Sequence, residues 1–192
     1  MMLAAFAEPV FDSQRTFREL LQAMARPAVP RRLPVLPPAP APVRPEAMAI
    51  LLTLCDAATS VWLQHPAAEV AGHLRFHAGL RLAEQTQQAD FALIDAPASM
   101  PALDSFACGD LRYPDRSASL IMQVEGFRTD RGRRFAGPGI RDTEMLAIEG
   151  LPDEFWHRRA ELSAQLPLGV DLYFVAAQHV VAMPRTTRLL ED

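Results

Sequence analysis

Proline is concentrated in one stretch of the chain, and this stretch limits the possible folds more than any other feature. Eight of the seventeen prolines lie between residues 27 and 45. Because proline donates no backbone hydrogen bond, neither a helix nor a central strand can run through the stretch. An edge strand within residues 29–36 is still compatible, and residues 37–45 are predicted to be an extended, stiff connection. The segment before it is too small for its own core, so we predict one domain over residues 1–192.

Helical and strand-like patterns follow one another along the rest of the chain. Apolar residues at helical spacing predict helices over residues 12–25, 45–55, 66–78 and 152–165. Apolar runs bounded by turn residues predict strands over residues 61–63, 91–94, 120–124, 170–176 and 179–183, the last two joined tightly at Ala177-Gln178. A short helix over 99–106 and a hairpin pairing 134–136 with 120–124 are further expectations. Because helices come early and paired strands late, we predict an α/β or α+β layered domain with a mixed sheet.

The basic residues of the chain are unusual, because all 19 are arginine and lysine is absent. A GC-rich genome, which favours arginine codons, explains the bias. Whatever its origin, the bias excludes a Schiff base on a lysine and the phosphate-binding lysine of a P-loop. The net charge of −4 argues against broad nucleic-acid binding. The densest basic cluster, Arg131, Arg133 and Arg134, is interpreted as a solvated turn.

The cysteine count and the hydropathy pattern indicate where the chain works. Two cysteines, Cys55 and Cys108, are too few for a disulfide framework, which predicts a reduced, intracellular protein. The first residues lack the basic region of a signal peptide, and no stretch approaches the roughly 18 apolar residues that span a bilayer. We therefore expect a cytoplasmic protein that does not enter a membrane.

Motifs that carry chemistry are weak in this sequence. His73 and His77 are spaced to share a helix face and could hold a metal, but no third ligand is evident, so we predict packing or surface histidines and no metal site. The turn at 137–139 could bind an anion through backbone N–H groups, although Pro138 removes one donor and a plain turn is favoured. Cys55 lies on an apolar helix face and Cys108 in a loop, and both are interpreted as structural thiols.

The most anion-like cluster is the segment Pro184–Thr187. One guanidinium, on Arg185, and two adjacent hydroxyls, on Thr186 and Thr187, suit a phosphate or phosphonate oxyanion. Asp171 begins an apolar strand, where a carboxylate is costly unless it is paired. These four residues form our candidate anion-binding site. The alternative is structural: a polar strand exit or an interface salt bridge for Arg185, and a hydrogen-bonded partner for Asp171.

Several segments, taken in order, resemble one known family. They are residues 17–27, residues 51–63, Leu74–His77, Gly137–Ile140, and above all Leu166–Asp171 together with Met183–Thr187. This set resembles the PhnH family, the H subunit of the carbon–phosphorus lyase pathway, over roughly residues 5–188. The match rests on the ordered set, and the family supplies no catalytic residue that can be carried onto a position here.

The resemblance implies a three-layer α/β/α fold similar to that of pyridoxal-phosphate-dependent transferases, but without a cofactor. The lysine-free composition agrees, since the usual internal aldimine cannot form. It also implies a homodimer that assembles with subunits G, I and J. In that family, subunits G, H and I act with the L protein to place a phosphonate on the ribose of ATP, which displaces adenine. The product is a ribose 1-phosphonate 5-triphosphate, and the radical subunit J later cuts the carbon–phosphorus bond.

Because the displacement is ascribed mainly to subunit I, the resemblance implies an accessory subunit with no activity of its own. No catalytic set is evident in the sequence, which agrees with this role. One alternative is a nucleotide- or phosphonate-binding enzyme subunit that uses Arg185, Thr186 and Asp171 around a cleft. Another is a degenerate cofactor-fold protein that binds free pyridoxal phosphate without a covalent link.

Overall fold

A seven-stranded mixed sheet runs through the computed structural model, which describes residues 3–190. Its strands are β1 (Arg31–Arg32), β2 (Ser60–Leu63), β3 (Arg81–Leu82), β4 (Phe91–Ile94), β5 (Ser119–Gln123), β8 (Asp171–Ala176) and β9 (His179–Met183). They stand in the order β1-β9-β8-β5-β4-β2-β3. The five strands from β8 to β3 are parallel, whereas β9 and β1 are added in antiparallel fashion. The predicted mixed α/β sheet is therefore confirmed.

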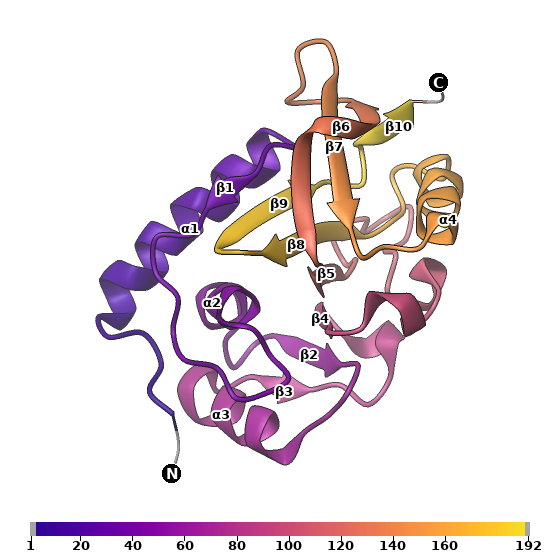
Figure 1. Cartoon of the computed structure of the whole chain (residues 1–192). Coiled ribbons are helices and arrows are strands. Elements are labelled where there is room, and N and C mark those ends of the chain that lie inside the picture. The colour runs from indigo at the N-terminus through magenta and orange to yellow at the C-terminus, as the bar shows by residue number, and fades with distance from the viewer. Residues whose placement is uncertain (1–2, 191–192) are drawn as a thin grey trace.

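Three helices cover one face of this sheet (Figure 1): α1 (Pro9–Ala25), α2 (Pro45–Leu54) and α3 (Ala68–Ala78). Residues 46–51 of α2 are all buried, because this short apolar helix lies between its neighbours and the sheet. The core on this face combines side chains from the helices and the strands, among them Leu20, Met48, Ile50, Leu74, Val61, Ile121 and Tyr173.

The opposite face is covered by one helix and a second sheet. The helix is α4 (Asp153–Ser163), and the second sheet consists of β6 (Gly126–Ala136), β7 (Glu144–Glu149) and β10 (Arg188–Leu190) in the order β10-β6-β7. Aromatic side chains dominate the contact, and Phe135, Phe155, Trp156 and Phe174 pack against one another. The molecule thus has three layers, but the outer layer on this face is largely a small antiparallel sheet where the resemblance implied helices (Figure 1).

The predicted hairpin between residues 120–124 and 134–136 is wrong. β5 pairs in parallel with β4 and β8, and β6 pairs with β7 and β10 in the other sheet. β5 is a central strand with both faces buried: Leu120 and Met122 lie in one core and Ile121 in the other. Such a strand takes its partners from distant parts of the chain, so proximity in sequence misleads.

Most of the helix and strand ends that were predicted from turn residues are confirmed. Gly79 ends α3 in the left-handed conformation, with φ of 67°. Ala177 and Gln178 both have positive φ, and they join β8 to β9 in a tight hairpin as predicted. The helix expected over 99–106 is absent: this part of the described chain has single 3-10 turns at Pro97–Ser99 and Leu103–Ser105. Pro101 explains this result, because it removes a backbone donor in the middle of the segment.

The proline-rich stretch behaves as its composition requires. It supplies only a two-residue edge strand, β1, which pairs with β9, and then runs in extended form to α2. The expected edge strand is confirmed, although it is shorter than the window of residues 29–36 allowed. None of the helices within residues 3–190 is long and apolar enough to cross a membrane.

Candidate functional site

The hairpin of β8 and β9 brings Asp171 and Arg185 together. Asp171 is the first residue of β8, and Arg185 follows the end of β9 by two residues. The Arg185 Nη2 atom lies 2.7 Å from Asp171 Oδ2, and the Arg185 backbone N–H donates to Oδ1 over 2.8 Å. The two side chains are only 16% and 24% exposed. The carboxylate at the strand end is therefore paired, as the cost of burial demands.

The Arg185 guanidinium is saturated by acceptors of its own chain. Besides Asp171, it donates to the carbonyls of Pro114 (2.6 Å) and Pro167 (3.4 Å) and to the Ser117 hydroxyl. Its five N–H groups thus have five acceptors. An incoming anion would have to displace some of them. This geometry is what the structural alternative describes, and the anion-binding role of Arg185 stays a prediction.

The two threonines of the predicted cluster are differently placed. Thr187 is buried, and no partner for its Oγ1 atom is found among the described residues. Thr186 is half-buried, and Gly137 packs against its backbone. A Cβ at Gly137, whose φ is 143°, would lie 2.8 Å from the Thr186 carbonyl oxygen. The turn at 137–139 is therefore needed for close backbone packing.

A buried arginine of α4, Arg159, holds the segment 184–187 by hydrogen bonds to its backbone. Arg159 donates to the carbonyls of Pro184 (2.8 Å) and Thr187 (3.4 Å) and to the hydroxyl of Ser163. The pKa of Arg159 is lowered to about 10, mainly by burial; nearby Asp171 raises it and Arg185 lowers it by smaller amounts. The cluster is thus a closed network that fastens α4, β8 and the chain after β9.

This network lies at the amino-terminal edge of the parallel strands, because Asp171 begins β8 and Ser117 precedes β5. In open α/β sheets, ligands bind outside the carboxyl ends of the strands, at the point where successive connections leave to opposite faces. Here the connection after β2 passes through α3 on one face, and the connection after β4 passes through residues 97–105 on the other. The ends of β2 and β4 therefore mark that point.

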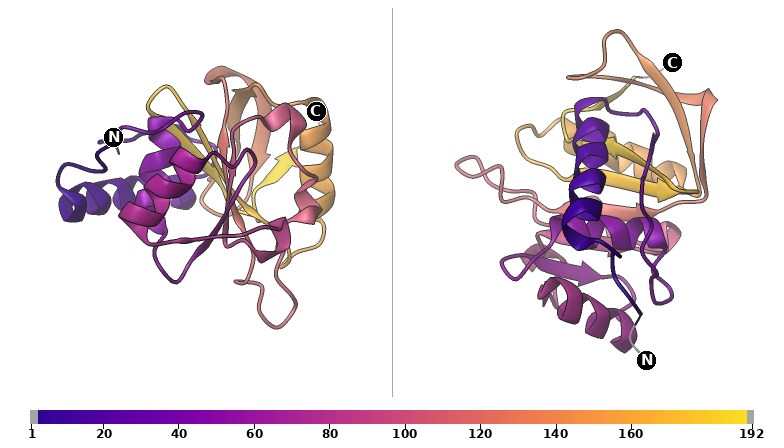
Figure 2. Two further views of the ribbon diagram at one scale, coloured as in Figure 1. Left: turned by 90° about the horizontal axis from the view of Figure 1, so that it is seen from below. Right: turned by 90° about the vertical axis from the view of Figure 1, so that its left-hand side faces the viewer.

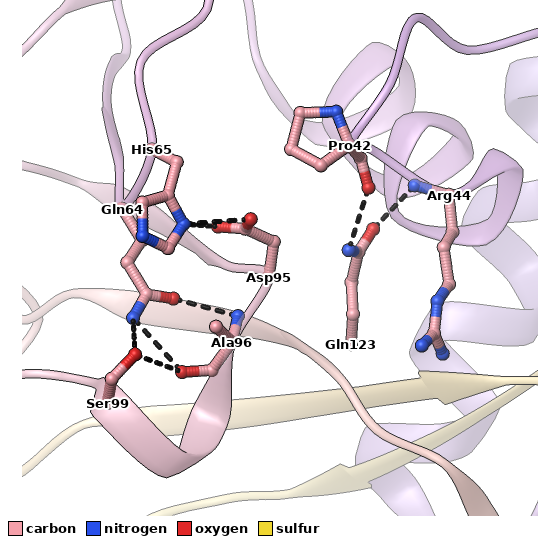
Figure 3. A network of polar contacts seen from close by, with 8 residues as sticks. All are labelled: Pro42, Arg44, Gln64, His65, Asp95, Ala96, Ser99 and Gln123. Atoms are coloured by element: carbon pink, nitrogen blue, oxygen red, sulfur yellow. Dashed lines mark hydrogen bonds and ion pairs between the residues drawn. The ribbon is translucent and has the colours of Figure 1, made fainter.

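An ion pair occupies this point, and sequence reasoning did not find it. His65 follows the end of β2, and Asp95 follows the end of β4. The His65 Nδ1 atom lies 2.9 Å and 3.0 Å from the two Asp95 carboxylate oxygens, as Figure 3 shows. The His65 side chain is 58% exposed, whereas that of Asp95 is 10% exposed. The imidazole therefore faces solvent while its carboxylate partner is held inside.

The Gln64 side chain holds the backbone next to this pair. Its Oε1 atom accepts from the Ala96 N–H over 2.9 Å, and its Nε2 atom donates to the Ala96 carbonyl over 3.0 Å (Figure 3). A weaker contact of 3.4 Å reaches the Ser99 hydroxyl. The amide thus continues the hydrogen bonding of β2 with β4 beyond the last residue of each strand, and it fixes the position of Asp95.

Other strand ends at this edge are covered by the chain itself. The buried Gln123 side chain, at the end of β5, accepts from the Arg44 N–H over 2.5 Å and donates to the Pro42 carbonyl over 3.1 Å (Figure 3). Glu46 accepts from the Gln178 N–H over 2.7 Å, just past the end of β8. The segment 42–46 therefore covers the ends of β5 and β8 and leaves those of β2 and β4 accessible.

A hollow of about 370 Å³ borders the loop that carries His65. Leu63 and Pro66, on either side of Gln64-His65, line the hollow together with Arg75 and Glu84. No acceptor for the Arg75 guanidinium is found among residues 3–190. The accessible part of the carboxyl edge therefore combines an imidazole, a carboxylate and a free guanidinium.

The remaining sequence candidates carry no comparable arrangement. Within the described part of the chain, no three metal-ligating side chains gather at one place, so His73 and His77 have no third ligand there. Their ring centroids lie 4.5 Å apart with the ring planes tilted by 54°, and His73 is buried. Burial raises the pKa of Cys55 to about 12 and also raises that of Cys108, which disfavours the reactive thiolate at both positions.

Comparison with known proteins points to one family. Residues 4–190 match the family model PhnH, described as a bacterial phosphonate metabolism protein. The chain is 37% identical over 187 residues to the alpha-D-ribose 1-methylphosphonate 5-triphosphate synthase subunit PhnH of Rhizobium meliloti, covering 96% of this chain and 94% of that one. It is 31% identical over 176 residues to HtxG of Stutzerimonas stutzeri, named as a C-P lyase subunit protein, covering 92% of this chain and 85% of that one.

Proposed function

The chain belongs to the PhnH family of bacterial phosphonate metabolism proteins, and on this basis we propose that it is an accessory subunit of a carbon–phosphorus lyase system. In this role it acts with subunits G, I and L to form a ribose 1-phosphonate 5-triphosphate from ATP and an alkylphosphonate. The observation that carries the proposal is the 37% identity with the Rhizobium meliloti synthase subunit over nearly the whole of both chains. A match of this extent includes both edges of the sheet and is more than a shared fold.

An exposed apolar face on α1 supports a role in assembly. Val10, Phe17 and Leu21 recur at helical spacing with Phe11 beside them, and these four side chains are between 48% and 78% exposed. The helix lies along the outer surface of the molecule, facing the viewer in the right-hand view of Figure 2. Contiguous exposed apolar side chains of this kind mark contact surfaces. We assign this face of α1 to contact with another subunit.

Subunits G, I and J are the proposed partners, and a homodimer is the proposed state of the chain alone. A cytoplasmic location is part of the proposal, and the small number of cysteines and the pathway support it. The proposal includes no cofactor, since the chain has no lysine with which to form an internal aldimine. The likeness to pyridoxal-phosphate-dependent transferases, the assignment of residues 1–192 to one domain and the inactivity of the isolated chain belong to the same proposal.

Co-purification tests the assembly role. The tagged chain, produced together with subunits G, I and J, is expected to retain all three. Leu21→Glu should weaken that retention, because it places a charge in the apolar face of α1. His157→Glu, at an exposed position of α4 on the other side of the sheet, should not. Both variants should keep the thermal midpoint of the parent. A parent chain that retains no partner, or an isolated chain that alone converts ATP and methylphosphonate, would contradict the proposal.

A further inference from the structure

We propose that His65 and Asp95 form a proton-transfer site that this chain contributes to the complex, with His65 Nε2 protonating the purine base as that base leaves the ribose. The inference rests on the proposed function, because it takes its reaction from there. It goes beyond an accessory role, since it gives this subunit a group that touches the reacting molecule.

The geometry of the pair fits a proton donor. Both Asp95 oxygens lie within 3.0 Å of Nδ1. Because an ionised carboxylate only accepts hydrogen bonds, this position favours the imidazole form with a hydrogen on Nδ1. The other ring nitrogen, Nε2, is then the atom that gains or loses the exchangeable proton. A carboxylate that orients an imidazole and stabilises its protonated form is the arrangement by which histidine serves as an acid or a base in hydrolytic triads.

The surroundings distinguish this pair from an ordinary surface ion pair. Asp95 is 10% exposed, and its backbone is held in place by the two hydrogen bonds between Gln64 and Ala96. Only the imidazole reaches outward. An exposed pair with two mobile partners contributes little, whereas a histidine set on a buried carboxylate keeps its ring orientation when a substrate arrives.

Charge decides between proton transfer and anion binding. The Asp95 carboxylate offsets the positive charge of a protonated His65, so the pair as a whole attracts a phosphate or phosphonate weakly. The same offset does not hinder transfer of the Nε2 proton. A lone histidine or an unpaired arginine would suit an anion better, and Arg75 in the neighbouring hollow is such a group.

The proposed reaction consumes one proton, at the purine base that leaves the ribose. A phosphonate oxygen forms a bond to C1′ of the ribose, the C1′–N9 bond breaks, and its electron pair goes to the purine. A phosphonate, like a phosphate, is already anionic at neutral pH and needs no base to become a nucleophile. The departing purine does require a proton, which His65 Nε2–H supplies. His65 is left neutral and regains a proton from solvent.

His65 is largely exposed in the isolated chain, so the site becomes complete only when another subunit covers it. A covered site excludes water and strengthens the interaction between the imidazole and the leaving base. The inference therefore places the open ends of β2 and β4 toward the ribose-binding surface of a partner. It also explains why the isolated chain is expected to be inactive.

The test uses the complete complex with the L protein, ATP and methylphosphonate, and it measures adenine release. His65→Gln is expected to lower kcat by on the order of 100-fold or more with little change in KM for ATP. Asp95→Asn should cause a smaller loss and change the pH profile of kcat. In His65→Ala, added imidazole should restore part of the rate, because the substitution leaves a space of the size of the ring beside Asp95. His157→Gln, at an exposed position on α4, is the matched control and should match the parent.

The outcomes separate the inference from the proposed function. A complex without this chain that still releases adenine contradicts the proposed function. A complete complex in which His65→Gln turns over at the parental rate overturns the inference alone. Loss of activity together with loss of assembly makes His65 a subunit contact and also overturns the inference. Loss of activity with intact assembly and imidazole rescue supports it.

Discussion

The two edges of the parallel sheet each carry an ion pair to a strand-end aspartate, and the two pairs differ in what remains available. At the amino edge, every N–H group of the Arg185 guanidinium has an acceptor within the chain, and both partners are largely buried. At the carboxyl edge, the described residues offer a partner to one nitrogen of His65, Nδ1, and the ring faces solvent. The Arg185–Asp171 pair thus stabilises the fold at the amino edge, whereas the His65–Asp95 pair leaves a ring nitrogen available for reaction at the carboxyl edge. Exposure and the number of unused donors separate the two roles.

The largest expected effect is a difference in the free energy of unfolding that is lost when the aspartate of each edge is removed. Asp171→Ala leaves Arg185 as a charge without its carboxylate in a mostly buried site, and we expect a loss of about 3–5 kcal/mol in the free energy of unfolding. Asp95→Ala should cost about 1 kcal/mol or less, because His65 is exposed and water replaces its partner. Urea denaturation of both variants at one pH measures the difference. Equal losses would break the comparison.

The closed character of the amino edge also predicts a dependence on pH. Cys55 lies near Thr59 and Asp90 at this edge, and burial raises the pKa of its thiol to about 12. A pKa that is higher in the folded state means that the unfolded thiol ionises first. Stability is therefore complete below the unfolded pKa near 9 and is lost as the pH rises toward 12.

This contribution amounts to about 1.4 kcal/mol between pH 8 and pH 10. Cys55→Ala should remove it, so the urea midpoint of the variant should fall less over that interval than the midpoint of the parent. Cys108→Ala should change the pH dependence less, because this thiol is only partly buried. Parallel pH profiles for the parent and Cys55→Ala would mean that water reaches this part of the amino edge.

The Gln64 amide allows a finer test of the carboxyl edge. Gln64→Ala removes the two hydrogen bonds that hold Ala96, and we expect a loss of about 1 kcal/mol in stability. Its effect on kcat in the assembled complex should be larger than that cost implies, since Asp95 would no longer be held in position. Gln87→Ala, in an exposed 3-10 turn, provides the comparison. A loss of stability without any loss of rate would show that Asp95 does not depend on Gln64.

The smallest expected effect concerns anion binding at the amino edge. If Arg185 serves only as a clamp, Arg185→Gln should leave the affinity of the complex for methylphosphonate unchanged, provided that the variant remains folded. Calorimetric titration measures this directly, and circular dichroism verifies the fold. A folded variant that no longer binds methylphosphonate would support the anion site at Arg185, Thr186, Thr187 and Asp171, and would weaken the contrast between the edges.

Local signals in the sequence predicted those parts of the fold that local chemistry decides. The β8–β9 hairpin follows from two apolar runs separated by Ala177-Gln178, and β4 follows from an apolar run between two aspartates. β5 was assigned a wrong partner because both of its true neighbours are distant in sequence. β7 was missed because its apolar residues are bracketed by Glu144 and Glu149 and resemble a polar loop.

The site was harder to predict than the fold. Asp171 and Arg185 were grouped correctly because one hairpin joins them, but their roles depend on acceptors from residues 114–117 that no pattern reveals. His65 and Asp95 are thirty residues apart and meet only through the parallel pairing of β2 with β4. Polar residues directly after two buried strands were the available signal, and it gains meaning once the strand order is known.

The edge strand β1 has a consequence for how copies of this protein can associate. It is two residues long, both are arginines, and Pro30 and Pro34 stand on either side of it. At the far border of the sheet, β3 is equally short. Neither edge of the seven-stranded sheet offers a long run of unpaired backbone N–H and C=O groups with which a strand of another molecule could pair. Pairing of this sheet with the same sheet of another molecule is therefore disfavoured, and copies of the chain that meet at these borders must associate through side chains rather than through backbone hydrogen bonds.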